Sequence, residues 1–271
     1  MADYETILYE EKDCVAWVTL NRPEVYNAFN AKMQHELRDM WRSLRANDDV
    51  RCAVLTGAGE KAFCTGIDRT ETMGGSRPDD LELGSGSTPF MFDDPGENIG
   101  PKSNDLWTPV IAAVNGMACG GAFYMLGEVE FIIAADHATF FDPHVTYGMT
   151  AAFEPIHMLQ KMPFPEIMRL SLLGNHERMS AKRAFDIGMV SEVVPGAELH
   201  DAAAWAAEAI ASAPPLAIQG TLRAIWMALE QTRSQALAEA YAYIAMGTNQ
   251  ESIAQGQEFF ASGKRIEWRL R

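Results

Sequence analysis

Strand and helix patterns alternate along the first half of this chain, and that alternation limits the possible folds more than any other feature. Residues 14–20, 51–56 and 109–115 are short runs of β-branched and other apolar residues, which are typical of buried strands. Between the first two runs, Asn30 is a predicted N-cap for a helix that extends to Arg45. Strands that alternate with helices usually pair in parallel, so we expect an α/β core.

The last third of the chain has a different, alanine-rich pattern. Alanine has the highest helix propensity, so these stretches predict helices. The change of pattern near Pro195 predicts an α/β core over residues 1–195 and a helical region over residues 196–271. Apolar side chains at helical spacing in the second region are expected to form core or subunit contacts. The predicted helices are residues 199–212, 216–229, 235–246 and 251–262.

Residues 71–105 interrupt the alternation. They are rich in Gly, Ser, Pro and Asp, and the pattern predicts a long excursion without regular structure. Long loops of this kind in compact domains are usually functional or disordered. The segment is either a lid over a substrate site or a tolerated insertion, and the residues do not decide between the two.

Charge and cysteine content exclude several classes of protein. Asp and Glu total 37 and Lys and Arg total 22, which gives a net charge of −15. Phosphate backbones and anionic membranes require basic surfaces, so we expect neither nucleic-acid nor membrane partners. The N-terminus lacks a signal-peptide pattern, and the four cysteines form no Cys-x-x-Cys pair. These features predict a reduced, cytoplasmic protein without a metal site.

Two stretches predict a strand, a glycine-containing turn and then a helix. They are residues 54–68 and 114–122. Free N–H groups at such turns can point at one spot, and two converging turns could hold an oxyanion. One donor of this kind lowers a reaction barrier by about 2.7–4 kcal/mol. The alternative is that the glycines only let a helix pack closely on a strand.

Other common sites are missing from the sequence. It contains no Gly-x-Gly-x-x-Gly between a strand and a helix, no phosphate-binding P-loop and no Gly-x-Ser-x-Gly. The six histidines show no His-Glu-x-x-His or other ligand spacing. The sequence therefore disfavours a dinucleotide-dependent dehydrogenase, a nucleotide hydrolase, an α/β-hydrolase and a zinc protease.

Taken together, several segments resemble the crotonase, or enoyl-CoA hydratase/isomerase, family. The likeness extends from about residue 5 to the end of the chain. It implies the ClpP/crotonase fold, an α/β spiral of ββα units with a helical C-terminal oligomerisation region. The segments are Asn21-Arg22-Pro23 with Asn27-Ala28, residues 62–68, residues 109–121, Ala138-Thr139-Phe140 with Pro143, and Ala184 with Gly188-Met189-Val190.

The resemblance also implies an enzyme that acts on an acyl-CoA thioester and needs no cofactor beyond the CoA of its substrate. The backbone amides of Ile67 and Gly121 would hold the thioester oxygen while an enolate forms. The family assembles as homotrimers or dimers of trimers, so the same is expected here. Residues expected along the CoA are Glu24, Val25, Thr65, Gly66, Ile67, Asp68, Arg69, Gly120 and Gly121.

The chain departs from this family at two positions. Family hydratases carry two glutamates that handle water and the α-proton, and here those positions hold Tyr124 and His144. A tyrosine, with a pKa of about 10, would be a proton or hydrogen-bond donor, whereas histidine, near 6.5, could act as acid or base. Either the two residues replace the glutamates or they only line a pocket. We expect weak hydration of a short trans-2-enoyl-CoA.

Three acidic residues complete the set of candidates. Glu154 is a possible catalytic acid, or a carboxylate that favours the start of a helix. Asp142 is close enough in sequence to orient His144, and Asp68 could be an N-cap. A hydratase or isomerase is the favoured function. The alternatives are hydrolysis of a thioester or of a C–C bond β to it, with water activated by His144, and a non-catalytic acyl-CoA-binding protein.

Overall fold

The computed structural model describes residues 4–70 and 94–271, and its centre is a six-stranded sheet. Only the first pair of strands is antiparallel, and the others pair in parallel as the sequence predicts. In order across the sheet, the strands are β1 (Ile7–Lys12), β2 (Val15–Leu20), β3 (Cys52–Gly57), β5 (Val110–Val114), β7 (Phe131–Ala135) and β10 (Glu192–Val194).

A second sheet of four short strands lies beside the first. Strands β4, β6 and β8 directly follow β3, β5 and β7, so the chain passes from the large sheet to the small one three times. This repetition is the spiral that the resemblance implies. The sequence did not predict these strands because they are too short to show alternation. They are β4 (Ala62–Cys64), β6 (Met117–Cys119), β8 (Thr139–Phe141) and β9 (Met179–Ser180).

Helix α1 (Ala31–Leu44) forms one wall of the main core. Its N-cap is Asn30, as predicted, and the Asn30 side chain accepts a hydrogen bond of 2.9 Å from the Met33 amide. The fully buried Trp41 donates its indole N–H to the Ile99 carbonyl at 2.9 Å. The apolar face of the helix is thereby fixed against both the sheet and a neighbouring segment.

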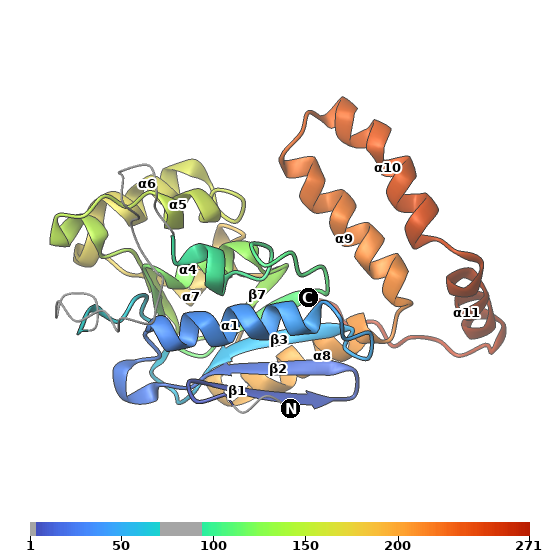
Figure 1. The fold of residues 1–271 in the computed structure, drawn as a ribbon, viewed down its shortest axis with the longest axis horizontal. Coiled ribbons are helices and arrows are strands. Elements are labelled where there is room, and N and C mark those ends of the chain that lie inside the picture. Colours follow the sequence, from blue (N-terminus) through green and yellow to red (C-terminus); the bar gives the residue numbers. More distant parts are fainter. Residues whose placement is uncertain (1–3, 71–93) are drawn as a thin grey trace.

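The opposite face of the sheet is covered by α8 (Leu199–Ala211). Small buried residues such as Ala203 and Ala207 pack against β3, β5 and β7. Within the predicted helical region 196–271, the first helix therefore packs on the sheet. The following helices, α9 (Pro215–Leu229), α10 (Arg233–Gly247) and α11 (Gln250–Ala261), project away from the core (Figure 1).

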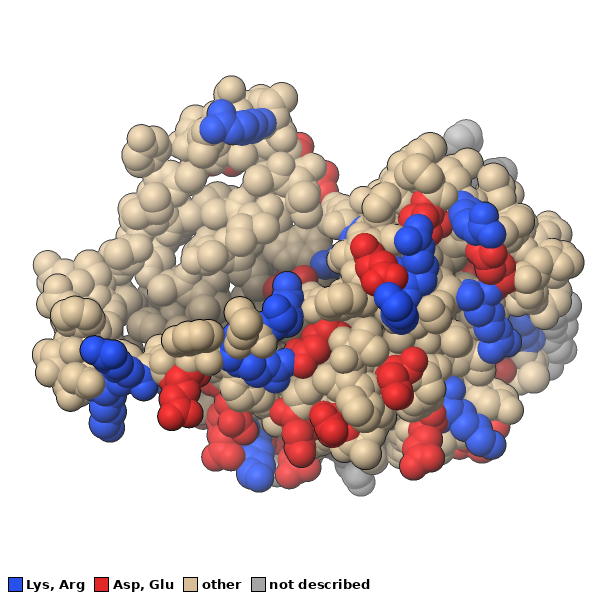
Figure 2. All heavy atoms as spheres, turned by 180° about the vertical axis from the view of Figure 1, so that it is seen from behind, with Lys and Arg blue, Asp and Glu red and all other residues tan. Residues whose placement is uncertain are grey.

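The projecting helices have an apolar surface. Figure 2 shows few charged side chains on this part of the molecule and a hollow between it and the core. Large apolar surfaces of this kind usually contact another protein chain. Exposed apolar residues here include Ile225, Leu237, Tyr241, Ile244 and Phe260. In the part of the chain that the structure describes, no helix combines the length and the apolar character needed to span a membrane.

The predicted excursion over residues 71–105 is wrong for its second part. Residues 71–93 lie outside the described residues, but residues 94–105 contain α3 (Gly96–Ile99), which packs against α1 and α4 (Ala122–Glu128). The side chain of Asn104 donates to the Gly100 carbonyl at 2.9 Å. The polar and glycine residues that suggest a loop here make buried turns instead.

Candidate active site

A cavity of about 440 Å³ opens where the ends of the short strands meet α4 and α5 (Phe153–Met158). Most of the site residues predicted from sequence lie on its wall, although they come from distant parts of the chain. The lining residues are Phe29, Thr65, Gly66, Ile67, Arg69, Pro95, Gly120, Gly121, Tyr124, Pro143, His144, Tyr147, Met149 and Glu154.

The two glycine turns meet in this cavity. Gly66 follows β4, and Gly121 lies between β6 and α4. A Cβ atom placed on Gly66 would lie 2.9 Å from the amide nitrogen of Gly121, and Gly66 has a φ of +84°. Only glycine combines this left-handed conformation with so close an approach. The turns therefore converge, as the sequence suggested, although the strands that lead into them are the short ones of the second sheet.

The amides of Ile67 and Gly121 are available at this meeting point. Phe29 donates its amide to the Gly66 carbonyl at 2.9 Å and accepts from the Asp68 amide at 2.8 Å. In a parallel bridge of this kind, the backbone groups of the intervening Ile67 point away from Phe29. Within residues 4–70 and 94–271, neither the Ile67 amide nor the Gly121 amide donates to another protein group.

Buried hydrogen bonds and an ion pair support the turn that contains Ile67. Asn27 is fully buried, and its side chain donates to the carbonyls of Ala58 and Ala62 at 3.0 and 2.9 Å. Arg22 forms an ion pair of 2.9 Å with the buried carboxylate of Asp68. Asp68 also accepts from the Thr70 amide at 3.1 Å, as an N-cap would. Its side chain therefore supports the turn.

Three of the residues predicted to follow the CoA lie away from the cavity wall. The side chain of Asp68 faces Arg22, and Glu24 and Val25 belong to a short 3-10 turn (Pro23–Val25). That turn is linked to the wall through the Thr65 hydroxyl, which donates to the Tyr26 carbonyl at 3.4 Å. The three residues therefore do not line the cavity.

His144 lies between two carboxylates. Its Nδ1 is 2.5 Å from Oδ1 of the fully buried Asp142, and its Nε2 is 3.3 Å from Oε1 of Glu154. The hydrogen bond with Asp142 raises the pKa of His144, while partial burial opposes that rise. Burial raises the pKa of the Glu154 carboxyl, and the nearby His144 opposes the rise. The two side chains are thus close enough to share one proton.

Tyr124 lies deeper in the same cavity, on α4. Its hydroxyl donates to Oδ2 of Asp94 at 3.0 Å, and burial is the main cause that raises its pKa well above the usual value. Glu154 and Asp94 raise the same pKa further. Tyr124 therefore stays a neutral phenol. Its partner Asp94 was not predicted, because it lies in the segment that looked like an irregular loop.

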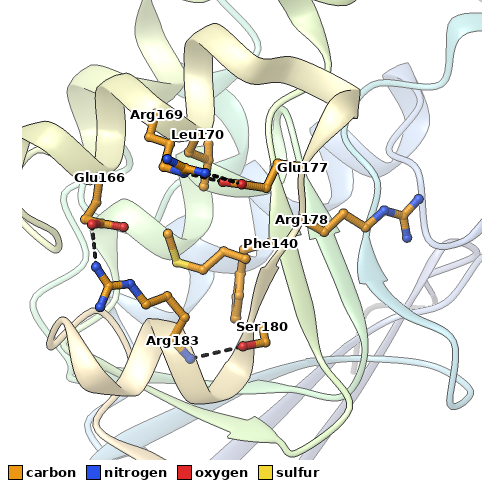
Figure 3. A pocket seen from close by; sticks show the side chains of 9 residues that line it. Phe140, Glu166, Arg169, Leu170, Glu177, Arg178, Ser180 and Arg183 are labelled. Atoms are coloured by element: carbon orange, nitrogen blue, oxygen red, sulfur yellow. Dashed lines mark hydrogen bonds and ion pairs between the residues drawn. The ribbon is translucent and has the colours of Figure 1, made fainter.

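A second cavity, of about 410 Å³, lies among α6 (Phe164–Leu173), β9 and α7 (Ala181–Asp186) (Figure 3). Two ion pairs cross it, with Arg169 bound to Glu177 through two contacts of 2.6 Å and Arg183 bound to Glu166 at 2.5 Å. Figure 3 shows Arg178 pointing away from the centre of this cavity. No predicted site residue belongs to it.

The sequence as a whole is similar to proteins of one family. The profile of the enoyl-CoA hydratase/isomerase family matches residues 10–271. The (E)-benzylidenesuccinyl-CoA hydratase of Thauera aromatica is 33% identical over 261 residues, with 96% of each chain covered. The carnitinyl-CoA dehydratase of Proteus mirabilis is 31% identical over 262 residues, with 94% of each chain covered.

A solved structure shows the same architecture. The enoyl-CoA hydratase/isomerase from Mycobacterium paratuberculosis superposes with a TM-score of 0.84 at 33% identity. The match covers 99% of this chain and 100% of the other. The fold predicted from the resemblance is confirmed over nearly the whole length.

Proposed function

This chain belongs to the enoyl-CoA hydratase/isomerase family, and we propose that it adds or removes water next to the thioester of an acyl-CoA. The relatives named above are a hydratase and a dehydratase, which supports this reaction type. The observation that carries the proposal is one cavity whose wall holds two sets of groups. The free amides of Ile67 and Gly121 and the His144–Glu154 pair share its wall.

The two amides would stabilise the enolate. When water adds to the β-carbon of a 2-enoyl thioester, the electron pair of the double bond moves toward the thioester oxygen. Fixed N–H groups at that oxygen favour the charged intermediate without reorganising. The closeness of Gly66 to the Gly121 amide supports the view that both donors address one oxygen atom.

The His144–Glu154 pair would move the protons. One of the two groups takes a proton from water as the water oxygen bonds to the β-carbon, and the pair returns a proton to the α-carbon. Burial raises the pKa of Glu154, so its carboxyl holds a proton more readily than an exposed one, which suits a group that must take and return a proton. In this proposal, His144 and Glu154 replace the usual pair of glutamates, and Tyr124 is not an acid.

The CoA would enter beside the Ile67 turn. Thr65, Gly66, Arg69 and Gly120 line the cavity near that turn, whereas Glu24, Val25 and Asp68 would contact the CoA only outside it. The apolar surface of α9, α10 and α11 supports a homotrimer or a dimer of trimers, because other copies of the chain would cover that surface.

Gly66→Ala tests the oxyanion site directly. The added methyl group would meet the Gly121 amide, so kcat toward a series of trans-2-enoyl-CoA thioesters should fall by about 10²–10³-fold. Gly188→Ala is the matched control, because Gly188 has the same φ of +84° but no atom within 4 Å of the new methyl group. Equal activity of the two variants would refute the proposed role of these amides.

A second reaction, hydrolysis, is favoured by the 2.5 Å contact between His144 and Asp142. A carboxylate behind an imidazole is the arrangement that activates water as a nucleophile. In that case water attacks a carbonyl carbon, and either the C–S bond or a C–C bond β to the thioester breaks.

Release of free thiol would show thioester hydrolysis, and formation of a carboxylic acid with a shortened acyl-CoA would show C–C cleavage. Loss of the enoyl-thioester absorbance with neither product shows hydration.

A further inference from the structure

We propose that Asp94 is a positioning residue that turns the Tyr124 hydroxyl into a hydrogen-bond acceptor toward the cavity. This inference rests on the proposed function, because it concerns how water or a hydroxyl group is held next to the His144–Glu154 pair. It assigns a role to the residue found where family hydratases carry a glutamate, and to a carboxylate that the sequence did not identify.

Asp94 is buried and uses both of its carboxylate oxygens. Only 8% of its surface is exposed. Oδ1 accepts the Gly96 amide at 2.9 Å, and Oδ2 accepts the Tyr124 hydroxyl at 3.0 Å. The first bond fixes the carboxylate to its own turn, so the second has a defined direction.

The tyrosine ring is held from two sides. A Cβ atom on Gly96 would lie 2.5 Å from Cδ1 of Tyr124, so the backbone of the Asp94 turn lies directly against the ring. The imidazole of His157 meets the ring edge-on, with centroids 5.4 Å apart and planes at 78°. The next residue of the turn, Pro95, lines the cavity itself. The ring cannot swing away from Asp94 without displacing this turn.

The direction of the hydroxyl follows from a count of hydrogens. A phenol has one hydrogen to donate and two lone pairs. The hydrogen bond of 3.0 Å points this hydrogen at the buried Asp94 and leaves the lone pairs toward the cavity. Glu154 is the second hydrogen-bond partner of this hydroxyl, so with this orientation its carboxyl bonds by donating its own hydrogen. A water molecule or a 3-hydroxyl group brings its own hydrogen and can donate to this oxygen. The site therefore favours ligands that donate a hydrogen bond at this position.

Asp94→Asn is the decisive variant, because an amide of the same size can donate to the phenol oxygen and reverse the hydrogen bond. With the fastest trans-2-enoyl-CoA of the series as probe, we expect kcat to fall at least tenfold and KM to change less than twofold. In the Tyr124→Phe background, the same substitution should cause less than a twofold further loss. If instead the two substitutions reduce kcat by factors that multiply in the double variant, Asp94 acts independently of Tyr124 and the proposal is overturned.

A spectroscopic measurement tests the hydrogen bond without any substrate. In protein labelled with ¹³C at tyrosine Cζ, Tyr124→Phe identifies the signal of Tyr124 among the 7 tyrosines. Donation to a carboxylate moves that signal downfield, so Asp94→Asn should move it upfield. Asp105→Asn should leave it unchanged, because Asp105 pairs with Arg45 at the exposed end of the same segment. An unchanged signal in Asp94→Asn would overturn the proposal.

The two proposals can fail separately. If Gly66→Ala keeps full turnover but the Tyr124 signal moves as expected, the proposed function fails and the Asp94–Tyr124 arrangement stands. If Asp94→Asn does not fold, Asp94→Glu keeps the charge and displaces it along the side chain. That variant should also move the Tyr124 signal and lower kcat, and wild-type behaviour in both measurements would overturn the proposal.

Discussion

Two cavities of this molecule are nearly equal in volume, about 440 and 410 Å³, yet a carboxyl in each has its pKa shifted in the opposite direction. In the second cavity, the pKa of Glu177 is lowered and the pKa of Arg169 is raised, in both cases mainly by their mutual hydrogen bonds. Each group is held more firmly in its charged form. Such a pair cannot exchange a proton and is suited to holding two segments together.

In the first cavity, burial instead disfavours the charged form of a carboxyl. Burial raises the pKa of Glu154, and the hydrogen bond with Asp142 raises that of His144, so both groups of this adjacent pair bind a proton more readily than usual. Groups of this kind in a concave site point to chemistry. The comparison shows that the desolvation of carboxylates, rather than the density of charge, distinguishes the candidate active site.

Of the substitutions that test this contrast, His144→Ala should lower kcat the most. Among the described residues of the cavity wall, His144 is the only one with an imidazole, and its removal takes away a group for general acid–base catalysis, so kcat should fall by about 10³-fold. Acyl-CoA binding, measured by calorimetry, should weaken much less. His176→Ala is the control, because His176 is exposed and lies outside both cavities. Equal losses of kcat and binding would remove the catalytic role.

Glu154→Gln should have the next largest effect. The amide keeps the shape of the side chain but cannot exchange a proton, so we expect kcat to fall by about 10²-fold. The matched substitution in the second cavity is Glu166→Gln, which breaks the ion pair with Arg183 and should leave kcat unchanged. If the two substitutions have the same effect, the distinction between the cavities is wrong.

Much of this architecture could be predicted from sequence because long helices and strands show a repeated spacing of apolar residues. The helix capped by Asn30 occurs where it was predicted, and α4 follows the second glycine turn as expected. The short strands β4, β6 and β8 were missed because three residues show no periodicity, although β4 and β6 lead into the glycine turns and β8 leads to His144. Asp94 was missed because nothing in a glycine- and proline-rich segment indicates which side chain is buried.

The proximity of Asp142 and His144 followed from their spacing of two residues, whereas the approach of Glu154 did not. Glu154 belongs to α5, ten residues further along the chain, and its contact with His144 depends on how that helix packs. The convergence of Ile67 and Gly121 likewise required the resemblance to a known family. Local spacing predicts neighbours along the chain, and contacts between distant segments depend on packing that a single sequence does not display.

Stability should depend on pH through His144. Its pKa is raised in the folded protein, so its contribution to stability is fully present below the ordinary value of 6.5 and is lost as the pH rises through the raised pKa. His144→Gln should therefore reduce the free energy of unfolding more at pH 6 than at pH 9. Urea denaturation at the two pH values measures this difference, and equal losses would contradict the assigned contact with Asp142.

Arg183→Ala should have the smallest effect. Its guanidinium is about half exposed and pairs with Glu166 near the surface, where an ion pair adds less than about 1 kcal/mol to stability. We expect a slight decrease in the melting temperature and unchanged kcat and KM. A large loss of turnover would mean that the second cavity also takes part in the reaction. The contrast between paired surface charges and desolvated carboxylates would then no longer identify the active site.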